Sequence, residues 1–333
     1  MTTGLIDTFG RRASDLRVSL TDRCNLRCTY CMPAQGLPWL PREELLTTAE
    51  LVRLLDVAVT RLGVEEIRFT GGEPLLRPDL EEVVAAAAAL APRPRLSLTT
   101  NGIGLDARVD RLRGAGLERV NVSLDTLDPG VFARLALRER HGAVLAGLRA
   151  ARDAGLTPVK VNAVLVRGTN DHEAADLLAF CLAEGYELRF IEQMPLDAQG
   201  AWDRGRLVTA ADILGDLRAA GFALAPLAPR SRGAAPAEQW TVDGGPATVG
   251  IIASVTRPFC RACDRTRLTA DGQVKSCLFA HDEHDLRAAL RAGAGDAELA
   301  ERWAAAMWGK PAGGAIAATD FVAPPRPMSA VGG

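Results

Sequence analysis

Six short runs rich in β-forming residues alternate with longer helical patterns over the first 194 residues, and this alternation limits the fold more than any other feature. The helical patterns lie at about 47–62, 78–91, 106–115, 142–154 and 170–184. Such repetition predicts a parallel sheet with right-handed crossovers. Six units predict an α/β fold with an incomplete TIM-type (β/α)6 barrel rather than a closed eightfold one. The runs are Leu16–Leu20, Glu66–Thr70, Arg95–Thr100, Arg119–Leu124, Val159–Val166 and Glu187–Met194.

The predicted strands have one polar and one apolar face, whereas parallel strands covered by helices usually read as continuous apolar runs. Successive side chains point to opposite faces of a strand, so one face packs against helices and the other lines a polar lumen. This pattern predicts a binding site inside the barrel. An antiparallel sheet with one wetted face would give the same alternation, but the intervening helices favour the barrel. The polar set is Arg17, Ser19, Glu66, Arg68, Thr70, Ser97, Thr99, Asn121, Ser123, Lys160 and Asn162.

The composition changes after residue 195, which predicts a division into a barrel over 1–222 and a C-terminal region over 223–333 that closes it. Residues 225–247 are rich in Ala, Pro, Gly and Arg, as expected of a loop or a poorly ordered connection. The tail from Ala323 is rich in Pro and Gly, and its composition predicts a frayed terminus.

Charge and cysteine usage narrow the class of protein. The formal net charge is −2 over 333 residues, which argues against a nucleic-acid or membrane-surface binder. The first residues lack a basic segment followed by an apolar core, and the longest apolar run is too short to cross a bilayer, so a cytoplasmic location is expected. The seven cysteines are an odd number, which favours metal ligation or catalysis over disulfides.

Three cysteines directly after the first predicted strand form the pattern C-x3-C-x2-C: Cys24, Cys28 and Cys31. Three closely spaced thiolates suit an iron–sulfur cluster, which normally takes four ligands. No fourth cysteine lies nearby, so one iron would remain open to a small molecule. The alternative is a zinc site with a distant fourth ligand, although zinc triplets of this form are unusual.

This motif, with Tyr30 just before its last cysteine, resembles the radical S-adenosylmethionine (SAM) signature. The resemblance implies a [4Fe–4S] cluster on the three cysteines, with SAM on the open iron and a 5′-deoxyadenosyl radical formed by one-electron cleavage of SAM. Gly71-Gly72-Glu73-Pro74 resembles the motif that lies beside the SAM amino group, where glycine would let the main chain approach the ligand. The SAM contacts implied by this similarity are Tyr30, Gly72, Ser123 and Met194.

A second group of cysteines, Cys260, Cys263 and Cys277, forms C-x2-C-x13-C. His281 lies four residues after Cys277 and could complete a Cys3His zinc site, so spacing alone does not separate zinc from an iron–sulfur cluster. The Arg-x-Arg pair between the ligands, Arg265 and Arg267, fits a phosphate-bearing partner, because guanidinium groups bind phosphate bidentately.

From Arg17 to the terminal Gly332-Gly333, the chain resembles the GTP 3′,8-cyclases of molybdenum cofactor biosynthesis. The resemblance implies a second [4Fe–4S] cluster on the second cysteine group, GTP as substrate, and a glycine tail that reaches towards the active site. It implies an external electron donor and a cyclic pyranopterin monophosphate synthase acting on the product, and it allows a homodimer. Arg265 and Arg267 are also candidates for assisting the final reduction. The implied GTP contacts are Arg17, Arg68, Thr99, Lys160, Arg265, Thr266 and Arg267.

Arg68 and Lys160 lie inside otherwise apolar strands, where an unpaired charge is costly, so a triphosphate is expected to supply their partner. Cys181 lies among apolar residues at helical spacing and is predicted to be a packed core thiol, whereas His141 is expected at the surface. Two other function classes stay open: a radical SAM enzyme that modifies a peptide, and a zinc-stabilised interaction protein.

Overall fold

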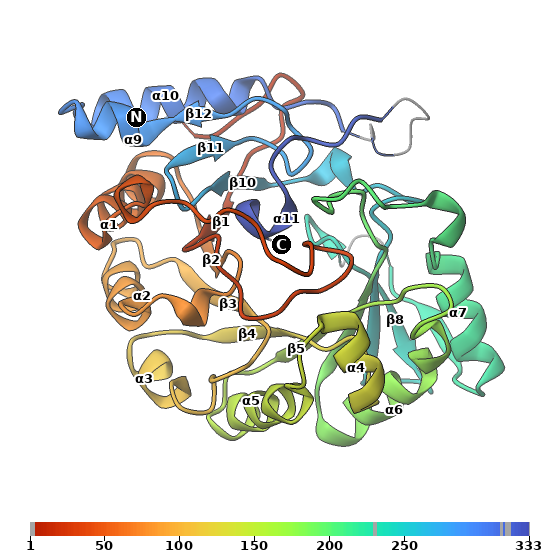
Figure 1. Cartoon of the computed structure of the whole chain (residues 1–333). Coiled ribbons are helices and arrows are strands. Elements are labelled where there is room, and N and C mark those ends of the chain that lie inside the picture. Colours follow the sequence, from red (N-terminus) through yellow and green to blue (C-terminus); the bar gives the residue numbers. More distant parts are fainter. Residues whose placement is uncertain (1–3, 229–231, 314–315, 317–320, 333) are drawn as a thin grey trace.

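The computed structural model describes residues 4–228, 232–313, 316 and 321–332. A twelve-stranded sheet curls round the centre of this part of the molecule, and helices cover its outer face (Figure 1). The strands are β1 (Asp15–Ser19), β2 (Glu66–Thr70), β3 (Arg95–Thr100), β4 (Arg119–Ser123), β5 (Val159–Val164), β6 (Glu187–Ile191), β7 (Leu224–Pro226), β8 (Glu238–Val242), β9 (Thr248–Ile252), β10 (Arg265–Leu268), β11 (Gln273–Lys275) and β12 (His284–Asp285).

Most of the helices lie in the chain between one strand and the next and connect the two. Short helical turns lie at Arg42–Glu44, Val57–Arg61, Pro74–Leu76, Asp171–Glu173, Arg204–Arg206 and Cys260–Ala262. Among the described residues, no helix combines the length and the apolar character needed to cross a membrane. The helices are α1 (Thr48–Asp56), α2 (Leu80–Ala88), α3 (Val109–Gly114), α4 (Pro129–Ala136), α5 (His141–Asp153), α6 (Ala174–Glu184), α7 (Ala210–Ala219), α9 (Leu286–Arg291), α10 (Asp296–Trp308) and α11 (Met328–Val331).

The predicted incomplete parallel barrel is confirmed, and the C-terminal region extends it at both edges. Strands β1 to β6 are parallel neighbours in chain order, and β10 pairs in parallel with β1 while β9 pairs in parallel with β6. Antiparallel strands follow outside them, β11 and β12 on one side and β8 and β7 on the other. The outermost strands of the described sheet, β12 and β7, are not neighbours in it, so hydrogen bonds do not close the barrel.

The structure corrects several details of the sequence prediction. The stretch 225–247 contains the end of β7 and all of β8, where Trp240 and Val242 are buried on one face and alternate with less buried residues. Strands β4, β5 and β6 are shorter than predicted. The chain leaves β6 at Glu192. The buried carboxylate of Glu192 accepts hydrogen bonds from the main-chain N–H groups of Ala210, at the start of α7, and of Val255 and Thr256. His141 is buried and packs edge-on against Phe132. Cys181 is fully buried in the core, as predicted.

Helix α4 was not predicted, although its start has a clear signal. Asp128 accepts a hydrogen bond from the Val131 main-chain N–H at 2.7 Å, and Pro129 occupies the first helical position. The end of this helix holds the segment with the first three cysteines. The N–H of Arg27 donates to the Ala136 carbonyl, and that of Thr29 donates to Leu135.

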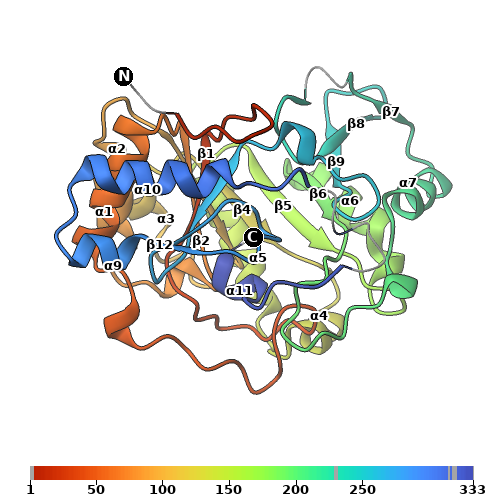
Figure 2. The ribbon, with the colours of Figure 1, turned by 90° about the horizontal axis from the view of Figure 1, so that it is seen from above.

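The C-terminal tail turns back into the middle of the barrel rather than fraying, and α11 lies inside the curl of strands (Figures 1 and 2). Arg326 anchors it through bonds of 2.6–3.0 Å to the carboxylates of Asp271 and Glu283. At its end, the carbonyl of Gly332 accepts a hydrogen bond from Arg267. Gly333, the second glycine of the expected tail motif, lies outside the described residues.

Arg326→Met should release this tail. A hydrogen-bonded charged partner contributes about 2 kcal/mol, which corresponds to roughly a thirtyfold change in an opening equilibrium. We therefore expect amide hydrogen exchange over 328–332 to be about thirty times faster than in the wild type. Arg302→Met, which removes an exposed pair with Glu298, is the control and should leave this exchange unchanged. Equal exchange in both variants would contradict the anchoring role.

Candidate active site

Two adjoining cavities occupy the lumen, and one group of three cysteines lies at each. The first, of about 170 Å³, is lined by Cys24, Cys28 and Cys31, and the second, of about 270 Å³, by Cys260, Cys263 and Cys277. Both cavities are lined by Tyr30, Thr99, Ser123, Asp125 and Met328, so these residues stand where the cavities meet. The polar lumen predicted from strand alternation is therefore confirmed.

The glycines of the Gly71-Gly72-Glu73 motif bring two loops into close contact. A Cβ atom on Gly71 would overlap the carbonyl of Thr21, and one on Gly72 would overlap the carbonyls of Asp22 and Arg23. Gly71 also has a φ of +139°, which side chains other than glycine rarely adopt. Both glycines also line the first cavity, where the sequence predicts an approach to a ligand. The structure adds a second reason for them, because they let the end of β2 pack against the loop that carries Cys24.

Glu73 joins this loop to the end of β3. Its buried carboxylate accepts hydrogen bonds from the Thr100 hydroxyl at 2.6 Å and from the main-chain N–H groups of Asn101 and Leu75. Asn101 in turn donates to Asn25, next to Cys24. Burial raises the pKa of Glu73 to about 7, although its three donors act in the opposite direction. Glu73 therefore positions the cysteine loop from beneath.

The second group of cysteines is assembled by the hairpin of β10 and β11. Arg267 pairs with Lys275, and Leu268 pairs with Val274, in an antiparallel register. Continued for two more residues, this register places Cys277 opposite Arg265, and Arg265 lies two residues after Cys263 in the chain. The hairpin therefore brings Cys277 close to the other two cysteines, although thirteen residues separate it from Cys263.

Parallel pairing of β10 with β1 sets the two cysteine groups at opposite ends of the lumen. Asp15 is level with Arg265 and Val18 is level with Leu268. Cys263 precedes the start of β10, while Cys24 follows the end of β1. The five residues of β1, from Asp15 to Ser19, span roughly 13 Å at about 3.3 Å for each of the four steps. The length of this strand separates the two groups.

Cys31 and Cys263 differ in their electrostatic surroundings. Burial raises the pKa of Cys31 to about 12. Burial acts in the same direction on Cys263, but Arg265 and Lys310 outweigh it and lower the pKa of that thiol to about 7. These neighbouring cations favour the thiolate form of Cys263.

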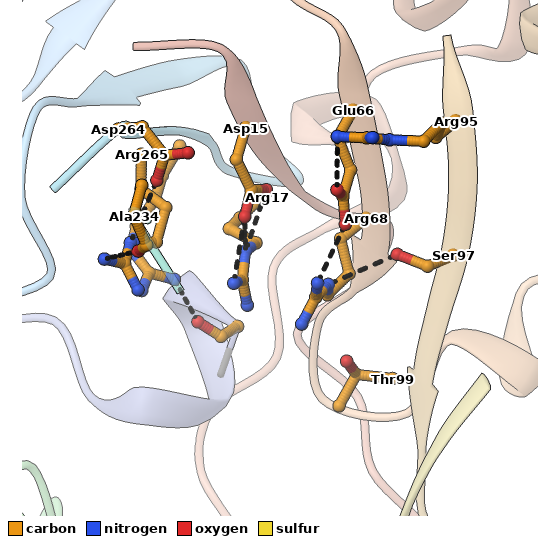
Figure 3. A network of polar contacts seen from close by, with 12 residues as sticks. Asp15, Arg17, Glu66, Arg68, Arg95, Ser97, Thr99, Ala234, Asp264 and Arg265 are labelled. Carbon is orange, nitrogen blue, oxygen red and sulfur yellow. Dashed lines mark hydrogen bonds and ion pairs between the residues drawn. The ribbon is translucent and has the colours of Figure 1, made fainter. Parts of the chain in front are cut away.

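Three arginines stand side by side on neighbouring strands at the second cavity. Arg17 of β1 is level with Arg267 of β10 on one side and with Arg68 of β2 on the other. Figure 3 shows the side chains of Arg17, Arg68 and Arg265 projecting from adjacent strands in the same direction. The second cavity is lined by all four of these arginines, Arg17, Arg68, Arg265 and Arg267, and by Thr99. Like charges at the spacing of adjacent strands repel each other, and an anion in the cavity would relieve that repulsion.

The expectation that a triphosphate alone would pair Arg68 and Lys160 is wrong. Glu66 lies 2.9 Å from Arg68, and Asp15 holds Arg17 in the same way at 3.1 Å (Figure 3). In both strands the carboxylate precedes its arginine by two residues on the same face. Lys160 pairs with Glu187 at 2.9 Å and is not among the residues lining the second cavity.

Two buried arginines of the second cavity lack a carboxylate partner among the described residues. Arg267 donates to the carbonyls of Val331 and Gly332, and Arg189 donates to the Asn121 side chain at 2.9 Å. Burial lowers the pKa of both to about 9, and neighbouring arginines act in the same direction. Arg189 was not predicted from the sequence, although Arg189 alternates with buried Leu188 and Phe190 as the polar residues of the other strands do with their neighbours.

The remaining predicted residues divide into two sets. Tyr30, Gly72 and Ser123 line the first cavity, and Met194 lines the second. Thr266 is not among the residues lining either cavity, and its hydroxyl accepts a hydrogen bond from Trp303 of α10 at 3.0 Å.

Asp125 also lies where the two cavities meet, and it was not predicted from the sequence. Its carboxylate accepts the Tyr30 hydroxyl at 2.6 Å and the Val164 N–H at 2.9 Å. Burial raises the pKa of Asp125 to about 6. Asp125 follows its strand by two residues on the polar alternate face, and that position was the available signal.

His281, the fourth ligand of the zinc alternative, is exposed, and its Nε2 lies 3.2 Å from the Val322 carbonyl. Among the residues that the structure describes, no three His, Cys, Asp or Glu side chains are grouped as ligands of one metal ion.

Comparison with known proteins agrees with this geometry. The Radical SAM superfamily matches residues 18–181, and Molybdenum Cofactor Synthesis C matches residues 186–316. The GTP 3′,8-cyclase of Streptomyces coelicolor is 66% identical over 329 residues, covering 99% of this chain and 96% of that protein. The chain belongs to the GTP 3′,8-cyclase family. A further member of the family, from Mycobacterium sp. (strain KMS), is 63% identical over 333 residues, covering 100% and 95% of the two chains.

Solved structures show the fold of this GTP 3′,8-cyclase family member in more distant proteins. Streptococcus suis SuiB bound to precursor peptide SuiA superposes with a TM-score of 0.62 at 16% identity, over 92% of this chain and 67% of SuiB. SuiB bound to S-adenosylmethionine gives 0.58 at 14% identity, over 92% and 68%. At such identities the likeness concerns the fold alone.

Thr266→Val and Thr99→Val separate a structural threonine from a cavity threonine. Thr266→Val leaves the buried Trp303 N–H without an acceptor, at a cost of about 1–3 kcal/mol in unfolding free energy. We expect denaturant unfolding to show this loss, while calorimetric affinity for GTP stays unchanged. Thr99→Val should weaken GTP binding, and it should also lower stability because the buried Asn121 amide loses Thr99 as its acceptor. A loss of GTP affinity in Thr266→Val would show instead that Thr266 faces the ligand.

Proposed function

We propose that this protein is a radical SAM enzyme that converts GTP to (8S)-3′,8-cyclo-7,8-dihydroguanosine 5′-triphosphate, the first step of molybdenum cofactor biosynthesis. Family membership over the whole chain supports the reaction. The observation that carries it is the lumen, where two groups of three cysteines face two adjoining cavities with a row of arginines between them.

The residues fit two [4Fe–4S] clusters, one on Cys24, Cys28 and Cys31 and one on Cys260, Cys263 and Cys277. Each group supplies three thiols to its cavity, so one iron of each cluster would be left for a ligand. When bound, the first cluster with SAM supplies the radical that takes a hydrogen atom from the ribose. On this proposal residues 1–222 hold the first cluster and residues 223–333 hold the second.

Unpartnered polar atoms support polar ligands in both cavities. Among the described residues, Asn162 Oδ1, Arg189 Nε, Ser254 Oγ and Ser329 Oγ are buried without a hydrogen-bond partner, and all four residues line the cavities. Such atoms are costly unless a ligand or water satisfies them. The chain thus holds donors and acceptors ready for a nucleotide and for SAM.

The side chains of the lumen have distinct tasks in this proposal. Arg17, Arg68, Arg189, Arg265 and Arg267 bind the triphosphate, and the carboxylates of Asp15 and Glu66 hold two of them in place. Tyr30, Gly72, Ser123 and Met194 surround SAM, with Asp125 fixing the Tyr30 hydroxyl. The tail closes the lumen and excludes water, since Val331 is fully buried there. Arg265 and Arg267 are also placed to assist the final reduction at the second cavity.

The reaction consumes electrons, so an external electron donor is part of the proposal, as is a cyclic pyranopterin monophosphate synthase acting on the product. A cytoplasmic location follows from the same pathway. A peptide-modifying radical SAM enzyme is the rival function, and it is favoured only by the fold of SuiB.

The anaerobic enzyme with dithionite, SAM and GTP should give 5′-deoxyadenosine and the cyclic nucleotide, identified by mass spectrometry. Protein purified without oxygen should contain about eight irons, four for each cluster. Cys24→Ser should abolish SAM cleavage, whereas Cys277→Ser should chiefly impair GTP turnover. SAM cleavage that requires a peptide in place of GTP would favour the rival, and stoichiometric zinc with little iron would exclude both.

Arg189→Met should raise the KM for GTP about tenfold or more, since a hydrogen bond to a charged group contributes about 1.5–3 kcal/mol. Arg95→Met is the matched control, because Arg95 is largely exposed and is absent from the residues lining the cavities. Binding of guanosine, which has no phosphate, should be equally weak to wild type and Arg189→Met. If guanosine loses as much affinity as GTP, Arg189 does not contact the phosphates.

A further inference from the structure

Lys310 is a buried lysine directly behind the second cysteine group. Its side chain follows α10 and is only 3% exposed. Its Nζ donates to the main-chain carbonyl of Arg265 at 2.6 Å and to that of Cys263 at 3.3 Å. The ammonium therefore lies against the chain that carries one of the three thiols.

The docking of α10 on the sheet fixes this position. Trp303 is fully buried, and its indole N–H donates to Thr266 of β10. Seven residues later, two turns of helix further on, the Lys310 N–H donates to the Met307 carbonyl and ends the helix. The helix thus delivers Lys310 to the start of β10, where Cys263 lies.

The charge of Lys310 is not compensated by a carboxylate, since no ion pair is formed by it within the described chain. The other buried lysine nearby, Lys275, pairs with Glu283 at 3.2 Å. Arg11, which donates to the Cys260 carbonyl at 2.8 Å, pairs with Asp7 at 2.5 Å. A buried charge without a counter-charge is costly, so an anion is expected beside Lys310.

The segment over 310–313 contacts the second cysteine group. A Cβ atom on Gly313 would overlap the side chain of Cys260, and Arg11 bonds the carbonyls of Pro311 and Ala312 as well as that of Cys260. Lys310 itself is buried, and a charge held away from water acts more strongly than one in water.

The geometry points to Lys310 as the residue whose positive charge compensates an anionic iron–sulfur cluster on Cys260, Cys263 and Cys277 and raises its reduction potential. This inference rests on the proposed second cluster. Reduction adds a negative charge to the cluster, and a fixed cation stabilises that form. Net charge and nearby hydrogen bonds are among the factors that set the potentials of such clusters. Lys310 acts on the cluster through its charge and through its bonds to the main chain that carries Cys263. It is therefore a positioning residue and not a catalytic one.

The test uses the full chain with Cys24, Cys28 and Cys31 all changed to Ser, so that any iron belongs to the second site. Lys310→Gln removes the charge and keeps donors for the two carbonyls, whereas Lys310→Arg keeps the charge. Lys275→Gln is the control, because the charge of Lys275 is already paired. Iron content, the electron paramagnetic resonance spectrum of the reduced protein and the midpoint potential are measured without GTP.

We expect Lys310→Gln to lower the midpoint potential by at least about 59 mV, which for one electron corresponds to a tenfold change in the ratio of reduced to oxidised cluster. Lys310→Arg should stay close to the parent, and Lys275→Gln should change the potential less than Lys310→Gln. Loss of iron in Lys310→Gln with retention in Lys310→Arg would also support a charge requirement.

Equal potentials in all variants would overturn the inference, as would loss of iron in both Lys310 variants or an equal shift in Lys275→Gln. A parent that binds no iron would instead refute the proposed second cluster. The two failures are therefore distinguishable.

Discussion

The parallel register of β10, β1 and β2 places Arg267, Arg17 and Arg68 on one level of the barrel wall, and the rest of the site depends on this arrangement. Three guanidinium groups on adjacent strands repel each other, so the lumen needs negative charge. Asp15 and Glu66 supply part of it from below. A ligand can provide the remaining negative charge, and a triphosphate provides it best.

The same register separates the two cysteine groups. Because β10 and β1 run in the same direction, the cysteines before β10 and those after β1 lie at opposite ends of one lumen. A nucleotide held by the arginines between them can reach both ends. The fold therefore brings two cysteine groups with 228 residues between Cys31 and Cys260 to the two ends of a single lumen.

Several parts of the molecule hold the lumen closed rather than taking part in chemistry. Gly71 and Gly72 allow the cysteine loop to pack on the end of β2, and Glu73 ties that loop to β3. Arg326 anchors the tail, and Trp303 docks α10 so that Lys310 lies against the second site. These contacts pre-organise the site before any ligand binds, which reduces the cost of binding.

The sequence by itself determined the barrel, its polar lumen and the two cysteine groups, because strand alternation and motif spacing are local properties. Arg189 could have been found by the same alternation. Tertiary structure alone decided that Lys160 and Thr266 leave the cavity, since a carboxylate on β6 and an indole on α10 claim them. It also decided that β10 joins β1 and that an uncompensated lysine stands behind Cys263. Pairing between segments distant in the chain depends on packing and register, which no local pattern encodes.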